Sequence, residues 1–318
     1  MMLAMTGDDY DQRSLQRRRE VLALPMVALQ HPRHLAPTNR LEWRTVPDAV
    51  GVGPEGAAYA VWPHSIDSRR KQVASYTEAG LGAVAEIQTQ LRVRFVQPLP
   101  GDQLLLVAAR ARRQPLNAEI WNWQGQRTGV GQLGDAIESL LTTPSGKVWV
   151  GYFDEALGGR GPEGHGLARF SSSLDSEWLY PGGSSLPSIV DCYTLNVDGE
   201  DAYCCPYTGF HLLAMRGDTV TDRGPAPHHF ADGLLIDGTR GALIGGQQAE
   251  YDQATPMHLD TRRVAAAGAP RRIVRPNGIE IAGRGYQCRG PNLHVFINNT
   301  WYQIGLDTLT APPPAVSI

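Results

Sequence analysis

The sequence predicts an all-β chain in which four-stranded sheets repeat around a common axis. Residues 135–181 contain four strand patterns joined by turns, and residues 147–152 (KVWVGY) alternate most strongly. Related strand-turn-strand segments recur as NVDGEDAYCC, LIDGTRGALIGG and PLPGDQLLLVA, at a spacing of about 40 to 50 residues. The 35 glycines and 23 prolines are typical of a chain with many turns. The predicted architecture is a six-bladed β-propeller, with seven or five blades as alternatives.

Residues 135–181 serve as the reference blade. An apolar run at 137–141 is followed by a Pro-Ser-Gly turn, and the alternating strand 147–152 comes next. After a glycine-rich loop, residues 166–170 and 176–180 complete four strands. Trp149 lies at the centre of the alternating strand, so we expect its ring to pack between neighbouring blades.

The other blades follow the same pattern with weaker signals. Blade 1 is predicted at 40–80, blade 2 at 91–133, blade 4 at 187–222, blade 5 at 229–267 and blade 6 at 272–306. In blade 1 we expect strands at 41–44, 49–53, 57–62 and 72–76, with 79–85 as a connector. Blade 4 is expected to begin with a strand at 192–197. In blade 6 we expect strands at 278–282, 286–288, 293–297 and 301–304.

The two ends of the chain differ from the repeat. Residues 1–37 are predicted to be an N-terminal extension, 38–309 the propeller and 310–318 a proline-rich tail without regular structure. Within the extension, 7–11 are expected to be disordered and 11–20 to form a short charged helix. Residues 22–29 are predicted to close the ring, because a strand from one terminus often pairs into a blade built by the other.

Composition limits the partners and the compartment. The formal net charge of −3 argues against a nucleic-acid partner, which usually requires a basic domain. No apolar run reaches the length of a membrane span, and the N-terminus lacks the shape of a signal peptide. We therefore expect a cytoplasmic protein, with secretion as the less favoured alternative. The four cysteines fit no zinc spacing and are expected to be buried and reduced.

The reference blade resembles the two-component-regulator propeller repeat. The matching residues are 145–151 (SGKVWVG) and 166–170 (GLARF), so the match is specific over one blade and loose elsewhere. The wider run, including VGYFDE, DCYTLNVDG and ALIGG, is similar to single-domain propellers of actinobacteria. The resemblance implies a fold and no particular chemistry. The sensor proteins with this repeat are much longer and membrane-anchored, so their signalling role does not transfer.

Propeller geometry converts scattered polar residues into one candidate site. The loop that enters each innermost strand opens on the same face as the loop between strands two and three. The entering loops contain Asp48, Asp135, Asp191, His228, His229, Asp232 and Asn277. The second set of loops contains Arg110, Arg112, Arg113, Asp154, Glu155, His165, Tyr207, Glu250, Tyr251 and Asp252. Loops are polar in any case, so position alone assigns no role.

Four of these residues are the predicted catalytic set: Asp154, Glu155, Asp191 and His229. The adjacent carboxylates Asp154 and Glu155 suit acid–base chemistry or a hard cation, or else a solvated turn. His229 precedes an innermost strand and titrates near neutral pH, although a loop histidine often only bonds to backbone. Asp191 occupies the corresponding place in blade 4, where it also fits a turn cap. We expect the four side chains to approach one another at one mouth of the channel.

The leading functional hypothesis is a polar small-molecule site at that mouth, with hydrolase-like or lyase-like catalysis as one form of it. The alternative is a non-enzymatic scaffold for a protein partner, which exposed Trp121, Trp123 and Trp178 would support. The sequence has no phosphate loop, no GxSxG elbow and no HExxH helix. It indicates no particular cofactor or metal, and enzyme and non-enzyme both remain open.

Overall fold

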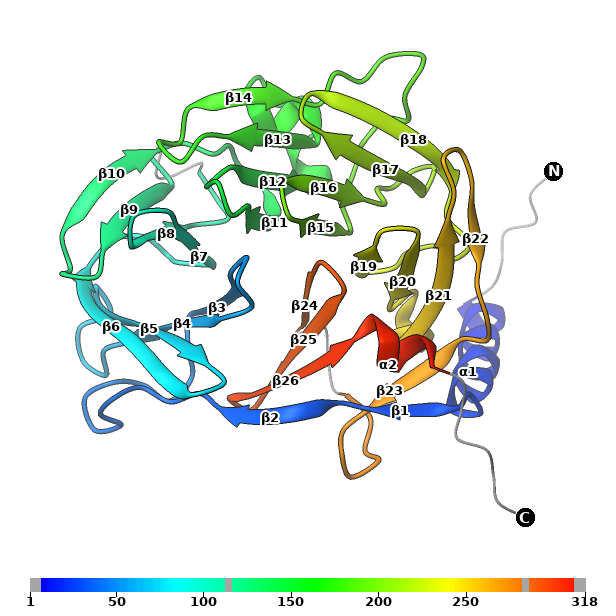
Figure 1. The fold of residues 1–318 in the computed structure, drawn as a ribbon, viewed down its shortest axis with the longest axis horizontal. Coiled ribbons are helices and arrows are strands. Elements are labelled where there is room, and N and C mark those ends of the chain that lie inside the picture. The colour runs from blue at the N-terminus through cyan, green and yellow to red at the C-terminus, as the bar shows by residue number, and fades with distance from the viewer. Residues whose placement is uncertain (1–6, 112–115, 282–285, 312–318) are drawn as a thin grey trace.

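The computed structural model describes residues 7–111, 116–281 and 286–311. Within these residues the chain forms six sheets around a central axis, and Figure 1 shows the ring viewed down the molecule's shortest axis. The first strand of each sheet lies nearest the axis, and the next strands pair antiparallel outward. The predicted six-bladed β-propeller is confirmed.

The first three blades are each a consecutive four-stranded meander. Blade 1 contains β3 (Ala49–Val52), β4 (Ala58–Pro63), β5 (Arg70–Thr77) and β6 (Gly80–Gln88). Blade 2 contains β7 (Phe95–Leu99), β8 (Gln103–Val107), β9 (Ala118–Asn122) and β10 (Arg127–Gly131). Blade 3 contains β11 (Ile137–Thr142), β12 (Val148–Tyr152), β13 (Leu167–Phe170) and β14 (Ser176–Leu179).

The last three blades begin as meanders, and the final two are completed by other segments. Blade 4 contains β15 (Leu195–Asp198), β16 (Asp201–Cys204), β17 (His211–Arg216) and β18 (Thr219–Pro225). Blade 5 contains β19 (Gly233–Asp237), β20 (Arg240–Ile244), β21 (Gln253–Leu259), β22 (Val264–Ala266) and β23 (Arg271–Val274). Blade 6 contains β24 (Tyr286–Arg289), β25 (Asn292–Ile297) and β26 (Thr300–Gly305), before the short helix α2 (Leu306–Thr310).

The N-terminal segment closes the ring with two strands. β1 (Met26–Ala28) pairs parallel with β23 of blade 5, and β2 (Gln30–His34) pairs antiparallel with β26 as the outermost strand of blade 6. The closing strand predicted at 22–29 is therefore borne out over 26–28, which form β1, whereas the strand that completes blade 6 is β2, just beyond the predicted range. β2 has a polar sequence that includes Pro32, which an edge strand tolerates because only one side of it makes ladder hydrogen bonds.

Three other predicted segments were wrong, and one predicted strand begins later than expected. Residues 41–44 form no strand, and Trp43 makes only an isolated bridge to His64. The fourth strand of blade 1 is instead β6, over the residues expected to be a connector. Residues 278–281, the described part of the strand expected at 278–282, contain only the bridge of Glu280 to Val274, so blade 6 begins at β24. Blade 4 begins at Leu195 and not at 192.

Helix α1 (Gly7–Leu22) lies outside the ring beside blade 5, as Figure 1 shows. It begins at Gly7, where disorder was expected, and includes the predicted helical residues 11–20. Arg18 makes a two-pronged ion pair with Asp252, at 2.6 and 2.9 Å, and the Asp252 carboxylate is fully buried. Arg17 reaches Glu250 at 2.5 Å. The helix is thus fastened to blade 5 by charge. Of the predicted tail, residues 312–318 lie outside the described part of the chain.

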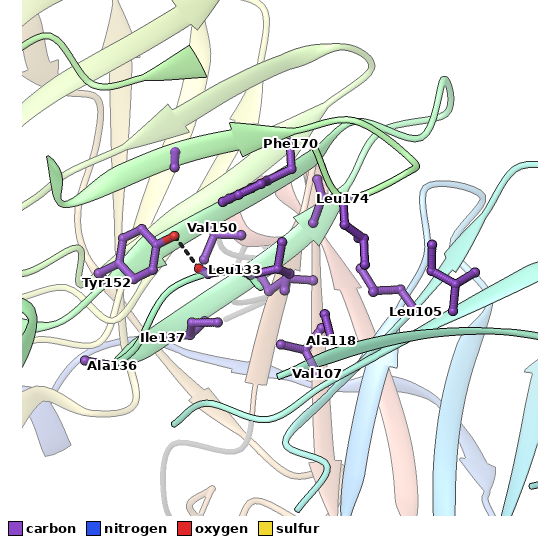
Figure 2. Close-up of a cluster of buried hydrophobic side chains, with 14 of the residues drawn as sticks. Leu105, Val107, Ala118, Leu133, Ala136, Ile137, Val150, Tyr152, Phe170 and Leu174 are labelled. Carbon is purple, nitrogen blue, oxygen red and sulfur yellow. Dashed lines mark hydrogen bonds between the residues drawn. The ribbon is translucent and has the colours of Figure 1, made fainter. Parts of the chain in front are cut away.

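Apolar clusters fill the seams between neighbouring blades. Figure 2 shows the cluster between blades 2 and 3, where Val107 and Ala118 face Val150 and Phe170. Tyr152 lies in the same seam, and its hydroxyl donates to the Leu133 carbonyl at 2.5 Å. Trp149, only 1% exposed, packs in the next seam with residues of blade 4, which confirms the predicted core position. In the described part of the chain, each seam between neighbouring blades thus contains its own buried apolar cluster.

Candidate functional site

A cavity of about 540 Å³ opens at the end of the channel where the innermost strands begin. We call it the entry mouth. Each blade supplies a polar residue within or just before its innermost strand: Asp48, Arg94, Glu138, Tyr193, Asp232 and Tyr286. This convergence follows from topology, because all six innermost strands start on the same face of the ring. The mouth therefore combines carboxylates, one guanidinium and two phenols in a single concave site.

Asp191 lies beside the entry mouth, two residues before Tyr193. Its backbone pairs with Tyr207, which donates from its amide to the Asp191 carbonyl at 2.9 Å. The carboxyl oxygen Oδ1 is buried and has no hydrogen-bond partner among the described residues. Burial raises the pKa of Asp191 to about 6, and the negative charges of Glu138 and Asp154 add to the shift. Asp191 is thus a carboxyl that changes protonation state close to neutral pH.

Tyr193 lies near several acidic groups of the entry mouth. Burial raises the pKa of its phenol, and Asp191, Tyr207, Asp154 and Asp232 each contribute to the rise. Carboxylates from three different loops therefore act on one ring at the mouth. Asp48, also at the mouth, forms an ion pair with Lys71, which is 5% exposed.

The predicted catalytic residues are divided between two places. Asp154 opens the short helix η1 (Asp154–Ala156) and is exposed, close enough to Asp191 to raise its pKa. Glu155, its neighbour, turns toward blade 2 and pairs with Arg110 at 2.6 Å. Arg110 also contacts Asp135 at 3.3 Å. The structure thus places Asp154 with Asp191, and Glu155 with a cation of its own. Arg112 and Arg113 lie outside the described residues.

His229 belongs to an aromatic cluster next to the mouth. Its exposed ring stacks on Phe210, with centroids 4.8 Å apart and planes 14° apart. Phe210 in turn contacts Phe230 and Tyr193, which leads from the histidine to the cavity wall. His228 instead contacts the Gly245 carbonyl through Nε2 at 3.0 Å, and burial lowers the pKa of its imidazole. His229 is therefore connected to the entry mouth by contacts between aromatic rings, and not by a contact with the carboxylates of the mouth.

Four lining residues were not singled out in the sequence: Arg94, Glu138, Tyr193 and Tyr286. Glu138 did carry a signal, since it is the one charged residue in the apolar run 137–141. It occupies the solvent-facing position of that run, which at the start of an innermost strand faces the channel mouth.

A buried arginine fills the channel beyond the mouth. Arg289, the last residue of β24, is 6% exposed. Its guanidinium donates to the Val52 carbonyl of blade 1 at 3.0 Å, to Gln97 of blade 2 at 2.7 Å and to the Thr142 carbonyl of blade 3 at 2.6 Å. On the other side, Asn196 links blades 4, 5 and 6 through the carbonyls of Leu234 and Gly290. The entry mouth is therefore a closed-ended cup.

The structure also shows where the cysteines and tryptophans singled out in the sequence lie. All four cysteines are free and buried, as expected. Trp121 is 5% exposed, and Trp123 and Trp178 are half-buried against other aromatic rings. The three tryptophans therefore form no exposed rim for a protein partner. Among the described residues, no group of three or more His, Cys, Asp or Glu side chains is arranged to hold a metal ion. No described helix combines the length and the apolar character needed to span a bilayer.

Comparisons with known proteins found similarity to solved structures of low sequence identity. No family model matches the chain, and no curated protein matches it. The calcium-binding protein regucalcin from Agrobacterium tumefaciens is 13% identical with a TM-score of 0.46, and the match covers 88% of this chain and 95% of that one. A protein named as a gluconolactonase is 12% identical with a TM-score of 0.44, covering 90% and 95%.

The extracellular domain of a hybrid two-component system from B. thetaiotaomicron is 14% identical with a TM-score of 0.42. That match covers 86% of this chain and 39% of the other, so the chain spans about two fifths of its length. At such identities the likeness concerns the fold alone.

Proposed function

We propose that the entry mouth binds a small molecule carrying a positive group and that Asp191 transfers a proton to or from it. The observation that carries the proposal is the Asp191 carboxyl, with its buried Oδ1 and a pKa of about 6, beside a cavity of about 540 Å³. A pKa near the working pH is what a general acid or base requires. Clefts of this size are the usual sites of small ligands.

The negative charges around Asp191 favour a positively charged ligand. Glu138 and Asp154 both raise the pKa of Asp191, and a bound cation or a positive group of a substrate would stabilise the ionised Asp191 carboxylate against their repulsion. The phenol ring of Tyr193 adds a face to which an ammonium is attracted. The set is therefore suited to an amine or a quaternary ammonium compound.

The proton chemistry then assigns roles within the predicted set. Asp191 in its ionised form accepts a proton from a water molecule or from an acidic C–H of the ligand, which corresponds to a hydrolase or a lyase. Asp154 and Glu138 act as fixed negative charges that raise the basicity of Asp191. His229 and Glu155 are then peripheral, the first through Phe210 and the second through Arg110.

The test begins with binding. Purified protein is titrated calorimetrically at pH 7 with a panel of small amines and quaternary ammonium compounds, and uncharged isosteres serve as controls. We expect at least one cation to bind and its isostere to bind at least tenfold more weakly, a difference of about 1.4 kcal/mol. Asp154→Asn should weaken that binding, whereas Asp175→Asn, a change of an exposed carboxylate in another loop, should not.

Catalysis is tested with any cation that binds and that offers a hydrolysable or eliminable bond. Asp191→Asn should remove turnover and keep binding within about tenfold, since the amide keeps the shape and loses the proton transfer. A wild-type protein that binds no cation of the panel, or a fully active Asp191→Asn variant, would refute the corresponding half of the proposal. A cytoplasmic location and the absence of a nucleic-acid partner stay predictions from the sequence.

A further inference from the structure

A second cavity, of about 640 Å³, lies at the opposite end of the channel, where the innermost strands turn back. We call it the exit cavity. It is bordered by the hairpin turns that contain Gly56, Pro144, Gly199 and Gly290, and it extends to Arg33 and His294 at the seam between blades 6 and 1. Nothing in the proposed function of the entry mouth involves this end of the ring.

The floor of the exit cavity contains a buried cation without a buried anion. Arg289 has no carboxylate partner in the described part of the chain, and its charge is surrounded by carbonyl and amide oxygens. Burial lowers the pKa of its guanidinium to about 9. Its four hydrogen bonds use four of the five N–H donors of the group and leave one Nη1 hydrogen over.

His294 supplies a second unsatisfied donor at the same place. The ring is 1% exposed and lines the cavity. Trp301 Nε1 donates to its Nδ1 at 3.1 Å, so the hydrogen of the neutral ring is on Nε2. Nε2 is buried and has no hydrogen-bond partner among the residues described. Burial, followed by the charges of Arg289 and Arg33, lowers the pKa of His294 to about 3, so the ring is a neutral N–H donor.

Arg33 completes the donor set, and carboxylates form the rim. The Arg33 guanidinium lies over the Trp301 ring at 4.7 Å and contacts Glu78 at 2.8 Å. The Glu78 side chain is 87% exposed, so that contact is weak and easily exchanged for a ligand. Glu55 and Asp198 lie on the same rim. The exit cavity thus has hydrogen-bond donors on its floor and carboxylates on its rim.

We propose that the exit cavity binds a small zwitterion with a carboxylate and a positive group side by side, as in an α-amino acid. The carboxylate accepts hydrogen bonds from His294 Nε2, from the spare Arg289 N–H and from Arg33. The positive group then faces the rim carboxylates Asp198 and Glu55. The same rim repels ligands with several negative charges, so the arrangement selects a zwitterion over a polyanion.

Binding is measured by isothermal titration calorimetry at pH 7 with glycine, L-lysine and L-glutamate as zwitterions. Acetate and methylamine represent the carboxylate and the ammonium group alone. We expect at least one amino acid to bind with a dissociation constant of about 1 mM or lower, and both fragments to bind at least tenfold more weakly. If no amino acid of the panel binds in this range, or if acetate binds as tightly as the best amino acid, the proposal is wrong.

Variants then locate the site. Arg33→Gln should weaken amino-acid binding at least tenfold, and Arg33→Lys should recover part of it. Arg44→Gln, an exposed arginine of a loop outside the cavity, is the matched control and should bind as the wild type does. Asp198→Asn should weaken the amino acid and leave acetate unaffected. Equal affinity in Arg33→Gln and Arg44→Gln would overturn the assignment.

A spectroscopic readout needs no substitution in the buried floor. The imidazole nitrogens of His294 are observed by ¹⁵N NMR of the wild-type protein, where Nε2 should carry the hydrogen before and after binding. On saturation with the amino acid we expect the Nε2 resonance to move and the Nδ1 resonance to stay close to its position, because only Nε2 gains a partner. An unmoved Nε2 at saturation would place the ligand elsewhere and contradict the proposal.

Discussion

At the scale of single residues, the molecule places two carboxyls with different environments in one mouth. Asp154 is exposed at the start of η1, whereas Asp191 has one oxygen buried without a partner. The difference follows from backbone position, since the Asp191 main chain is paired with Tyr207 and holds its side chain against the sheet. Burial of Asp191 and the nearby carboxylate of the exposed Asp154 both raise the pKa of Asp191.

The raised pKa of Asp191 predicts a pH-dependent stability. The folded value is about 6, whereas the unfolded value is about 3.9. Between them the folded state binds more protons, so this residue reduces stability as the pH rises through that window. Asp191→Asn should therefore raise the melting temperature relative to wild type at pH 8 and leave it nearly unchanged at pH 4. An equal shift at both pH values would show that the carboxyl does not titrate in this range.

Trp149 is the core residue whose replacement we expect to be most informative. Its ring is buried between blades 3 and 4 and contacts Trp178 edge-on at 5.4 Å. Trp149→Ala should lower the free energy of unfolding by about 3–5 kcal/mol, because no neighbour is free to fill the cavity. Urea denaturation gives the value. A loss below about 1 kcal/mol, typical of a surface change, would be inconsistent with this packing.

At the scale of elements, helix α1 is held by a charge pair more than by an apolar face. Val21 is its fully buried apolar residue, while Arg18 reaches the buried Asp252 and also Glu280 and Tyr251. The hydrogen bonds that Arg18 donates to the Asp252 carboxylate raise the pKa of Arg18 above its usual value. The helix thus depends on one desolvated ion pair.

Removing that arginine should be costly. Arg18→Gln leaves the Asp252 carboxylate buried without its partner, so we expect a loss of about 3–5 kcal/mol in the free energy of unfolding, or local release of the helix. Hydrogen exchange of the α1 amides distinguishes the two. Arg19→Gln, on the exposed side of the same helix, is the control and should change stability by less than about 0.5 kcal/mol. Similar results for both variants would show that the pair does not hold the helix.

The strands differ in how well they could be predicted from the sequence. β12 and β13 were predictable because apolar and aromatic residues occupy them and turns flank them. β6 was taken for a connector because its first half consists of small residues, and β2 was missed because an outer edge strand needs no apolar face. Propeller topology alone brought Asp154 and Asp191 to one face. Arg289 had no signal, since a buried arginine in a short strand looks like a surface residue in the sequence.

At the scale of the whole molecule, the channel is closed in the middle and open at both ends. Arg289, Gln97 and Asn196 connect the six innermost strands through their side chains and the backbone carbonyls they contact. The entry mouth and the exit cavity are therefore separate compartments on opposite faces. One has carboxylates gathered around Asp191, and the other has donors gathered around His294. The same ring of strands thus presents two sites with opposite hydrogen-bonding character.

Ring closure by the N-terminal strand has a consequence for biosynthesis. β2 is synthesised before every strand of blades 1 to 4, whereas its partner β26 follows all of those strands in the sequence. At about 5–20 residues per second, the growing chain spends tens of seconds with blade 6 incomplete and β2 without its partner. The polar sequence of β2 keeps that waiting segment soluble. Blade 6 is thus completed only after β26 has been made, by a strand that left the ribosome before any strand of blades 1 to 4.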